Sequence, residues 1–551
     1  MKRLIRVPRV PLLFAFVFLI FPAFSQTCDI TRSSGEGYFV SSDGLFSEVA
    51  ALPARFSTGL VGFNGEFALT DRHEDVILFM NRLGKRTGSV EFPAYEPSAL
   101  SFDGKNLVAA DGENGRIYFI DPKTGECVRT IDSPLAHVTG LACDRDGNVW
   151  VSAKGGKEIQ QVDPADGTTL AFIKSPSPSV SALAYDQNGY LWAADSKKDR
   201  IYMVDIRTGY TIFYISAPGP VVDGVWVDGG KVYASDYETD KLYVADVYTL
   251  NGKCVRSDER KGHATLFTEV QNLGPGDITG GTVTVAIPVD GPNQKLNKIT
   301  WTDGARIETD QWGQKAAVYK MKKMKPGEKE SLRMDAEGTF YRISTKIFPH
   351  EVGSLSEIQA EITKTYLQDG DKYQVKSEYI QNKVKTIVGH EKNPYFIARK
   401  LFDFLTGRIN YQMVGGWDIA PTVIERGTGS CSEYTFAYIA LCRAAGIPAR
   451  YVGSMVVRGE ASSVATAYHR WAEIYLPKIG WFPVDVNAGD RDWQGDRCFW
   501  FGGIENRFLI TTRGGGDSTL LKWGYNHEIE YQTLGKANIR NERFAEWDVV
   551  E

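Results

Sequence analysis

The sequence predicts a multidomain protein in which an all-β propeller of about five or six blades precedes a small β-sandwich and an α+β domain. Three observations support this prediction. Residues 50–255 repeat with a period near 40, residues 257–350 alternate apolar and polar side chains, and helical periodicity begins near residue 373. The chain has 551 residues, and at roughly 100–200 residues per domain this length corresponds to about three to five domains.

The composition is that of globular domains. Apolar residues make up 43% of the chain and charged residues 24%, which excludes a disordered or collagen-like protein. Lys and Arg total 63 against 68 Asp and Glu, so the net charge is −5 and no basic excess indicates a nucleic-acid partner. The chain has seven cysteines, an odd number, so at least one thiol is unpaired within the chain.

The N-terminus has the pattern of a secretory signal peptide. A basic start over residues 2–9 precedes an apolar run over residues 10–24, and the run is followed by Ser25. We expect cleavage after Ser25, which makes residues 1–25 the signal peptide and the mature protein secreted or periplasmic. A membrane span needs about 20 apolar residues, so we expect no stable span after cleavage, and an uncleaved anchor is the alternative.

The repeat in residues 50–255 is typical of propeller blades. Each unit contains paired strand patterns preceded by a turn glycine. These glycines are Gly65, Gly104, Gly147, Gly189 and Gly229. Their spacings of 39, 43, 42 and 40 residues match the length of one blade, and stacking blades around an axis buries both faces of each sheet. Five units are recognisable, and residues 36–50 would close the ring or add part of a sixth blade.

The repeats resemble those of NHL-type and streptogramin-lyase-like propellers. On this basis residues 26–256 form the propeller, whose loops would bind a substrate or a partner. A lyase site would need convergent acid and base residues, but the histidines of the repeat region are only His73 and His137. A propeller lyase is therefore the least favoured function. Cys28 and Cys254 bracket the region and are a candidate disulfide pair, although pairing cannot be deduced from sequence alone.

The middle segment, residues 257–350, consists of alternating runs with turn signals between them. One such turn is Lys325-Pro-Gly327. Runs of this length predict a small Ig-like β-sandwich. No residue pattern in it indicates chemistry, so its expected role is that of a structural spacer or a support for a lid.

Helical periodicity leads to the segment that carries chemistry. The apolar faces of two helices are formed by Ile380, Val384 and Ile387, and by Ile397, Leu401 and Phe404. A glycine-rich turn then leads into a helix that begins near Cys431 and ends before Gly446 and Pro448. The partial positive charge of a helix N-terminus favours the thiolate form of a cysteine placed there. Cys442 lies in the same helix and is expected to be buried and inert.

His469 begins a predicted strand, and Asp485 ends the next one. If these strands pair as a hairpin around residues 477–480, the two side chains come close together, and Cys431 on the packed helix completes a Cys-His-Asp set. Each of these residues alone is more often structural than catalytic. A zinc site made of Cys431, His469 and Cys498 is disfavoured, because it lacks a close pair of ligands.

The flanking motifs resemble those of the transglutaminase-like cysteine enzymes. They are Gly-Ser-Cys431-Ser-Glu, Ala-Gly446-Ile-Pro448-Ala-Arg450, His469-x-Trp-Ala-Glu-Ile-Tyr and Gly480-Trp481-x-Pro483-Val-Asp485. The gap from Cys to His is 38 residues and that from His to Asp is 16, both of the family's size. The resemblance covers residues 375–490 and implies a papain-like transglutaminase core within a catalytic domain at residues 351–551.

The resemblance also implies roles for individual residues. Cys431 would be the nucleophile, His469 the base and Asp485 the residue that orients the imidazole. Arg470 follows the histidine where a small residue is more usual in the family, which predicts narrower access to the thiol. The oxyanion hole would use the backbone N–H of Cys431 and an upstream donor. That second donor would come from Gln412 or Trp417, and the sequence does not choose between them.

Together these observations predict an exported cysteine enzyme that acts on amide bonds through a Cys431 thioester. The expected substrate is a protein or peptide, with a cell-envelope polymer as a further class, and the propeller would bind substrate or partner. Hydrolysis is favoured over amine transfer. No cofactor, metal, calcium or nucleic acid is expected to take part. The alternative is a catalytically inactive binding or scaffold protein in which the propeller is the functional part.

Overall fold

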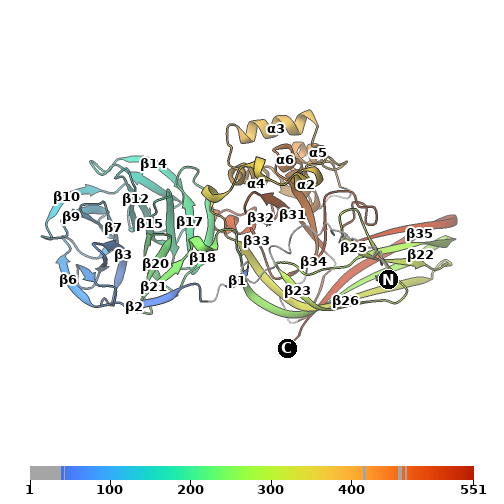
Figure 1. Ribbon diagram of the computed structural model, residues 1–551, viewed down its shortest axis with the longest axis horizontal. Coiled ribbons are helices and arrows are strands. Elements are labelled where there is room, and N and C mark those ends of the chain that lie inside the picture. The colour runs from blue at the N-terminus through green and yellow to red at the C-terminus, as the bar shows by residue number, and fades with distance from the viewer. Residues whose placement is uncertain (1–38, 42–43, 414–416, 457–461, 466–467, 551) are drawn as a thin grey trace, which may run out of the picture.

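The computed structural model describes residues 39–41, 44–413, 417–456, 462–465 and 468–550. A propeller, a large sheet of long strands and a unit of helices packed on a smaller sheet follow one another along the chain (Figure 1). The predicted signal peptide and Cys28 lie outside the described residues. No helix in the described part of the chain has both the length and the apolar character needed to cross a membrane.

Residues 47–246 form five sheets of four strands each. The first two consist of β3 (Ser57–Phe63), β4 (Glu66–Asp71), β5 (Val76–Met80) and β6 (Arg86–Glu91), and of β7 (Pro97–Phe102), β8 (Leu107–Asp111), β9 (Arg116–Ile120) and β10 (Cys127–Asp132). The next two consist of β11 (Val138–Cys143), β12 (Val149–Ala153), β13 (Glu158–Val162) and β14 (Thr169–Lys174), and of β15 (Val180–Tyr185), β16 (Tyr190–Asp195), β17 (Arg200–Asp205) and β18 (Thr211–Ser216). The last consists of β19 (Val222–Asp228), β20 (Lys231–Asp236), β21 (Lys241–Asp246) and β2 (Ser47–Ala51).

These sheets are the blades of a closed propeller. Their first strands contact one another in the cyclic order β3, β7, β11, β15, β19 and back to β3. The N-terminal strand β2 pairs with β21 as the outer strand of the last blade, so the two ends of the repeat are held in one sheet. The sequence left two roles open for residues 36–50, which were to close the ring or to add part of a sixth blade. Strand β2 closes the ring. The strand β1 (Phe39–Ser41) lies outside the ring and pairs with β22.

After the propeller, the chain enters a nine-stranded sheet that contains very long strands. Besides β1, its strands are β22 (Cys254–Ala286), β23 (Gln294–Trp301), β24 (Arg306–Thr309), β25 (Lys315–Met321), β26 (Lys329–Thr345), β30 (Ser462–Ala465), β33 (Gly503–Ile504) and β35 (His527–Val549). One edge of β22 pairs with β26 and then β25, and the other edge pairs with β35. Leu266 and Val285, from the two halves of β22, line the same small cavity, so the sheet folds back on itself as a sandwich does.

This pairing differs from the predicted domain limits of 257–350 and 351–551. Strand β35 belongs to the long sheet, because it pairs with β22 from Gly262 to Val285. Trp547 of β35 is 2% exposed and packs edge-to-face on Phe340 with ring centroids 4.9 Å apart. The end of the chain therefore completes the core of the middle region, and the two predicted domains share one sheet.

The C-terminal unit packs helices against a four-stranded sheet. Its helices are α2 (Ala360–Tyr366), α3 (Glu378–Val388), α4 (Pro394–Arg408), α5 (Ala420–Arg426), α6 (Cys431–Ala444) and α7 (Gln494–Arg497). The sheet order is β32 (Gly480–Val484), β31 (Tyr468–Leu476), β29 (Ala449–Val456) and β34 (Phe508–Gly514). Short elements complete the chain: η1 (Tyr248–Leu250), η2 (Pro349–Glu351), η3 (Leu355–Glu357), η4 (Cys498–Trp500), β27 (Asn410–Tyr411) and β28 (Thr428–Gly429). Helix α6 lies at the centre, in contact with α3, α4, α5, β29 and β31.

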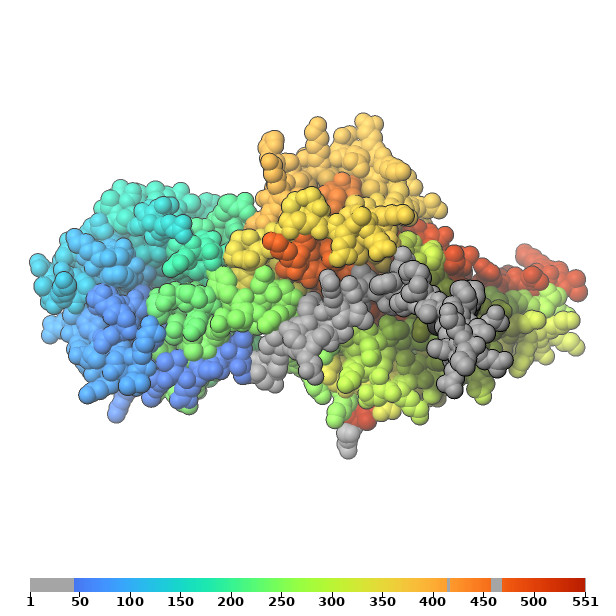
Figure 2. Space-filling model, viewed as in Figure 1, coloured from blue at the N-terminus to red at the C-terminus, as the bar shows by residue number. Residues whose placement is uncertain are grey.

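The propeller is docked against the C-terminal unit, and Figure 2 shows the two parts in contact across the middle of the molecule. The Arg399 guanidinium in α4 donates to the carbonyl of Thr211 in β18 at 3.1 Å. Lys198 of the propeller pairs with Asp496 in α7 at 2.7 Å. One continuous apolar core contains side chains from the propeller and from the helices. The predicted order of propeller, β region and helix-containing core is confirmed.

We expect Trp547→Ala to destabilise the protein by about 3–5 kcal/mol, because it empties a buried site between β35 and the rest of the sheet. The matched control is Tyr531→Ala in the same strand, where the side chain is exposed and the change should stay below about 0.5 kcal/mol. Urea unfolding followed by tryptophan fluorescence measures both. Equal effects of the two substitutions would show that β35 does not contribute a core residue.

Candidate active site

The local sequence places Cys431 at the first residue of α6. Helix α5 ends at Arg426 and is capped by Gly427, whose φ of +75° lies in the left-handed region that favours glycine. The chain then passes through β28 to Ser430, the residue that precedes α6. The buried carboxylate of Glu433 accepts the Ser430 N–H at 2.8 Å and pairs with Arg426 at 2.9 Å. These contacts fix where the helix begins, and so where the thiol lies.

Cys431 is 8% exposed. Burial by itself raises the pKa of this thiol, but the hydrogen bond and charge of His469 and the backbone N–H of Arg470 outweigh burial, so the pKa is lowered. The start of α6 acts in the same direction, because the N-terminal end of a helix favours negative charge. The thiolate form is therefore favoured at this position.

His469 and Asp485 lie on neighbouring strands of one hairpin. β31 and β32 pair from Ala472 to Leu476, which brings Asp485, just after β32, beside the start of β31. The Nε2 atom of His469 is 2.5 Å from Oδ2 of Asp485. Asp485 is 1% exposed, and its other carboxylate oxygen accepts the N–H of Ala488 at 3.0 Å. The carboxylate is thus buried, hydrogen bonded on both oxygens and directed at the ring.

This carboxylate determines the charge state of the histidine. Burial alone would lower the pKa of His469, but the charge and hydrogen bond of Asp485, together with the hydrogen bond to Cys431, raise it to about 10. Because Nε2 contacts Asp485, the ring has Nδ1 left for the Cys431 thiol. The arrangement can therefore hold an imidazolium beside a thiolate.

Helix α6 is tied directly to strand β31. The hydroxyl of Thr435, one turn into the helix, lies 2.8 Å from the carbonyl oxygen of Cys431 and 3.1 Å from that of Arg470. The His469 ring also stacks on Phe508 of β34, with ring centroids 5.4 Å apart. The thiol and the imidazole are thus held by elements that pack on each other.

Arg470 does not restrict access to the thiol as the sequence predicted. Its side chain is fully buried, and its guanidinium lies 3.7 Å from the ring centroid of Tyr525 and 4.6 Å from that of Tyr451. One of its N–H groups donates to the carbonyl of Trp523 at 2.8 Å. Side chains alternate along a strand, so Arg470 is directed away from the face that carries His469. The expectation of narrower access is wrong.

Two tyrosines near the thiol had not been predicted. Burial and the neighbouring Cys431 raise the pKa of Tyr525, which shares a hydrogen bond with Ser432. Burial and Cys431 also raise the pKa of Tyr411 in β27. Tyr525 lies in the tail beyond the recognisable motifs, so no sequence signal pointed to it. Tyr411 is next to Gln412, one of the two predicted candidates for the oxyanion donor.

Of the two candidates for the second oxyanion donor, Gln412 contacts the segment just before α6 and Trp417 contacts Tyr525. The backbone N–H of Gln412 donates to the carbonyl of Gly429 at 2.9 Å, close to the start of α6. The ring of Trp417 packs on Tyr525 with centroids 5.9 Å apart. The geometry does not select one of them.

The remaining cysteines of this unit lie apart from His469. Cys442 is fully buried inside α6, and burial raises the pKa of its thiol. Cys498 donates to the carbonyl of Gly495 at 3.3 Å and packs among propeller side chains such as Tyr202. Within the described ranges, no group of three or more His, Cys, Asp and Glu residues is placed to hold a metal ion.

The family model of the transglutaminase-like superfamily matches residues 381–486. This part of the chain is a transglutaminase-like domain. It spans most of α3 through β32 and contains Cys431, His469 and Asp485. The structure brings these three side chains together, and their catalytic roles stay a prediction.

Solved structures similar to larger parts of the chain have low identity to it. A provisionally assigned cysteine protease from Cytophaga hutchinsonii is 16% identical with a TM-score of 0.38, covering 53% of this chain and 92% of that one. A glutaminyl cyclase from Myxococcus xanthus is 17% identical with a TM-score of 0.33, covering 36% and 95%. Virginiamycin B lyase from Staphylococcus aureus is 19% identical with a TM-score of 0.26, covering 34% and 65%. No curated protein matches the chain.

We expect His469→Ala to slow the reaction of Cys431 with iodoacetamide at pH 7 by about tenfold or more, because each unit of rise in the thiol pKa lowers the thiolate fraction about tenfold. Without the imidazolium, burial would raise the pKa of the Cys431 thiol unopposed by His469. Mass spectrometry of the labelled peptides measures the rate, and the half-buried Cys127 in the same sample is the internal control. An unchanged rate at Cys431 would mean that the imidazole does not activate the thiol.

Proposed function

We propose that the protein is an exported cysteine enzyme that cleaves amide bonds of a protein or peptide through a thioester on Cys431. The proposal rests on one observation, the chain of contacts from Cys431 through His469 to Asp485. The Cys431 thiol, of lowered pKa, contacts the His469 ring, and that ring is held by the buried Asp485 at 2.5 Å. This arrangement supplies a nucleophile, an acid–base group and an orienting carboxylate.

In the first step, the Cys431 thiolate attacks the carbonyl carbon and forms a C–S bond, while the carbonyl oxygen becomes an oxyanion. The N–H of Cys431 is the proposed donor to that oxyanion, because the first N–H groups of a helix have no acceptor within it. When the tetrahedral intermediate collapses, the C–N bond breaks and the His469 imidazolium gives its proton to the leaving amine. The product of this half-reaction is an acyl thioester with a neutral imidazole beside it.

In the second step, the neutral His469 takes a proton from water while the water oxygen attacks the thioester carbonyl. The C–S bond then breaks, the carboxyl product leaves, and the thiolate–imidazolium pair is restored. An amine in place of water would give a new amide from the same thioester. We propose hydrolysis as the main reaction, because it needs only water, whereas amine transfer needs a second site that holds the acceptor.

The propeller is proposed as the module that binds the substrate or a partner. Its support is the packing of the blade edge against the transglutaminase-like domain and helix α7. The N–H of Gly495 in α7 donates to the carbonyl of Pro176 in a propeller loop at 3.0 Å, and the Arg399 guanidinium of α4 donates to the carbonyl of Thr211. A polymer held by the propeller loops would be presented at a fixed orientation to the unit that carries Cys431.

We expect Cys431→Ala to abolish cleavage of a peptide library, a loss of about a thousandfold or more, both with and without added amines. Cys127→Ala removes a half-buried thiol of the propeller and is the matched control, expected to keep full activity. Product analysis by mass spectrometry separates hydrolysis from amine transfer. Cleavage that survives Cys431→Ala would contradict the proposal, and absence of turnover by the wild type would favour a binding protein.

We expect Asp485→Asn to reduce kcat by roughly two to four orders of magnitude, because the amide preserves shape but no longer stabilises the imidazolium. With Asp485, the pKa of His469 is raised to about 10, so the ion pair persists as the pH rises and is lost near that value. Without it, the alkaline limb of the kcat/KM profile should move toward neutral pH. The exposed Asp492→Asn is the control, and an unchanged alkaline limb in Asp485→Asn would contradict this role.

A further inference from the structure

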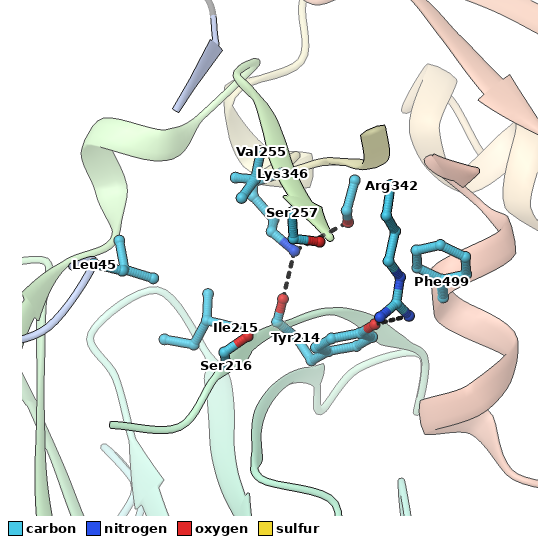
Figure 3. A pocket seen from close by; sticks show the side chains of 10 residues that line it. Leu45, Tyr214, Ile215, Ser216, Val255, Ser257, Arg342, Lys346 and Phe499 are labelled. Carbon is cyan, nitrogen blue, oxygen red and sulfur yellow. Dashed lines mark hydrogen bonds between the residues drawn. The ribbon is translucent and has the colours of Figure 1, made fainter. Parts of the chain in front are cut away.

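A small cavity lies where the propeller, the long sheet and the C-terminal unit meet, and it shares no residue with the site around Cys431 (Figure 3). Its volume is about 50 Å³. On this measure, one water molecule needs about 10–15 Å³, so the space could hold a few waters or one small ion. Its polar lining includes Ser257 of β22, Arg342 of β26, and Lys346 just after β26.

The ammonium group of Lys346 is the unusual feature of this cavity. Lys346 is 4% exposed, and its Nζ donates to the carbonyl of Tyr214 at 2.5 Å and to the hydroxyl of Ser344 at 3.0 Å. The same nitrogen lies 5.1 Å from the centre of the Tyr214 ring. An ammonium group has three N–H donors, so one is left for a further partner.

The carboxylates near the cavity are taken by other cations. Arg342 pairs with Asp258 at 3.5 Å and with Glu505 at 3.4 Å. Asp496 pairs with Lys198 at 2.7 Å and with Arg200 at 3.4 Å. Among the residues that the structure describes, Lys346 forms no ion pair with a carboxylate. The junction therefore carries one buried positive charge more than its carboxylates neutralise.

The other titratable groups that face Lys346 do not supply a negative charge that would neutralise its ammonium at pH 7. Burial lowers the pKa of Lys346 to about 8, and the charges of Arg342 and Arg200 act in the same direction, while the buried thiols Cys498 and Cys254 would oppose it only as thiolates. Burial raises the pKa of both thiols and of the Tyr214 phenol, so these groups are neutral at pH 7. A buried ammonium without a counter-charge is costly, and a bound anion would remove that cost.

We propose that this cavity binds a small anion, a carboxylate or a tetrahedral oxyanion, with Lys346 as its main partner. The Ser344 hydroxyl and the Arg342 guanidinium, which also donates to the Tyr214 hydroxyl at 2.9 Å, lie on the same cavity wall and are donors of the kind that such anions accept. The Ser257 hydroxyl, on this wall too, donates to Asp258 at 3.4 Å and would turn to the anion instead. The opposite wall is the edge strand β18 of the propeller, with Tyr214 and Ser216. A bound anion would therefore strengthen the attachment of the propeller to the rest of the chain.

The test uses the full-length protein at pH 7 and constant ionic strength, with sulfate or acetate replacing chloride. We expect a saturable rise in the thermal midpoint, and the relative response to the two salts shows whether an oxyanion or a carboxylate fits better. Lys346→Met should weaken this response about tenfold or more, a loss of at least about 1.4 kcal/mol in binding free energy. Lys198→Met, at the same junction but paired with Asp496, is the control and should keep the response.

A second variant keeps the test decisive if Lys346→Met does not fold. Ser257 lies opposite Arg342 in the register of β22 and β26, so Ser257→Asp places a carboxylate in the cavity. We expect it to raise the midpoint without sulfate and to abolish the sulfate response. Sulfate does not titrate in this range, so its affinity for the wild type should fall as the pH rises through about 8. No saturable response to either anion, or an equal response in Lys346→Met, would overturn the proposal.

Discussion

The contact between the His469 ring and the buried Asp485 carboxylate is the interaction on which the candidate active site depends. A thiol as buried as that of Cys431 would ordinarily keep its proton, because burial disfavours the charged form. The imidazolium offsets this effect, and the imidazolium itself persists only because Asp485 lies 2.5 Å away with its other oxygen hydrogen bonded. The lowered pKa of the Cys431 thiol thus depends on a carboxylate on another strand, which acts through the ring between them.

Cys431, His469 and Asp485 are positioned mainly by a helix and a strand hairpin. Cys431 begins a central helix whose start is fixed by Glu433, while the hairpin of β31 and β32 positions the ring and the carboxylate together. The Thr435 hydroxyl joins the helix to the strand. The rest of the molecule packs around this unit: the propeller contacts α4 and α7, and the long sheet contacts the unit through β33. The propeller and the candidate active site are therefore separate parts of one packed molecule.

Much of this arrangement could be predicted from local sequence. The repeat near 40 residues indicated the propeller, and the glycine-rich turn before Cys431 indicated the start of α6. The spacing of His469 and Asp485 around a turn indicated a hairpin, as the strand pairing now has it. Each of these features depends on residues close together in the chain, where periodicity and turn chemistry are informative.

The features that sequence could not provide depend on distant contacts. The pairing of β35 with β22 joins segments separated by most of the C-terminal half, and no local pattern reports it. The position of Arg470 next to His469 predicted narrower access to the Cys431 thiol. Because side chains alternate along a strand, the Arg470 side chain instead points into the core, where it packs on the ring of Tyr525. The buried charge of Lys346 likewise follows from three separate parts of the chain meeting at one junction.

The central claim, that Cys431 is held as a thiolate by His469, is tested most directly by the absorbance of the thiolate near 240 nm. The difference spectrum between the wild type and Cys431→Ala should show one thiolate per molecule at pH 7. The signal should persist down to the lowered pKa of the Cys431 thiol. A difference that develops only above the ordinary thiol pKa of about 8.5 would contradict the ion pair and, with it, the assignment of Cys431 as an activated nucleophile.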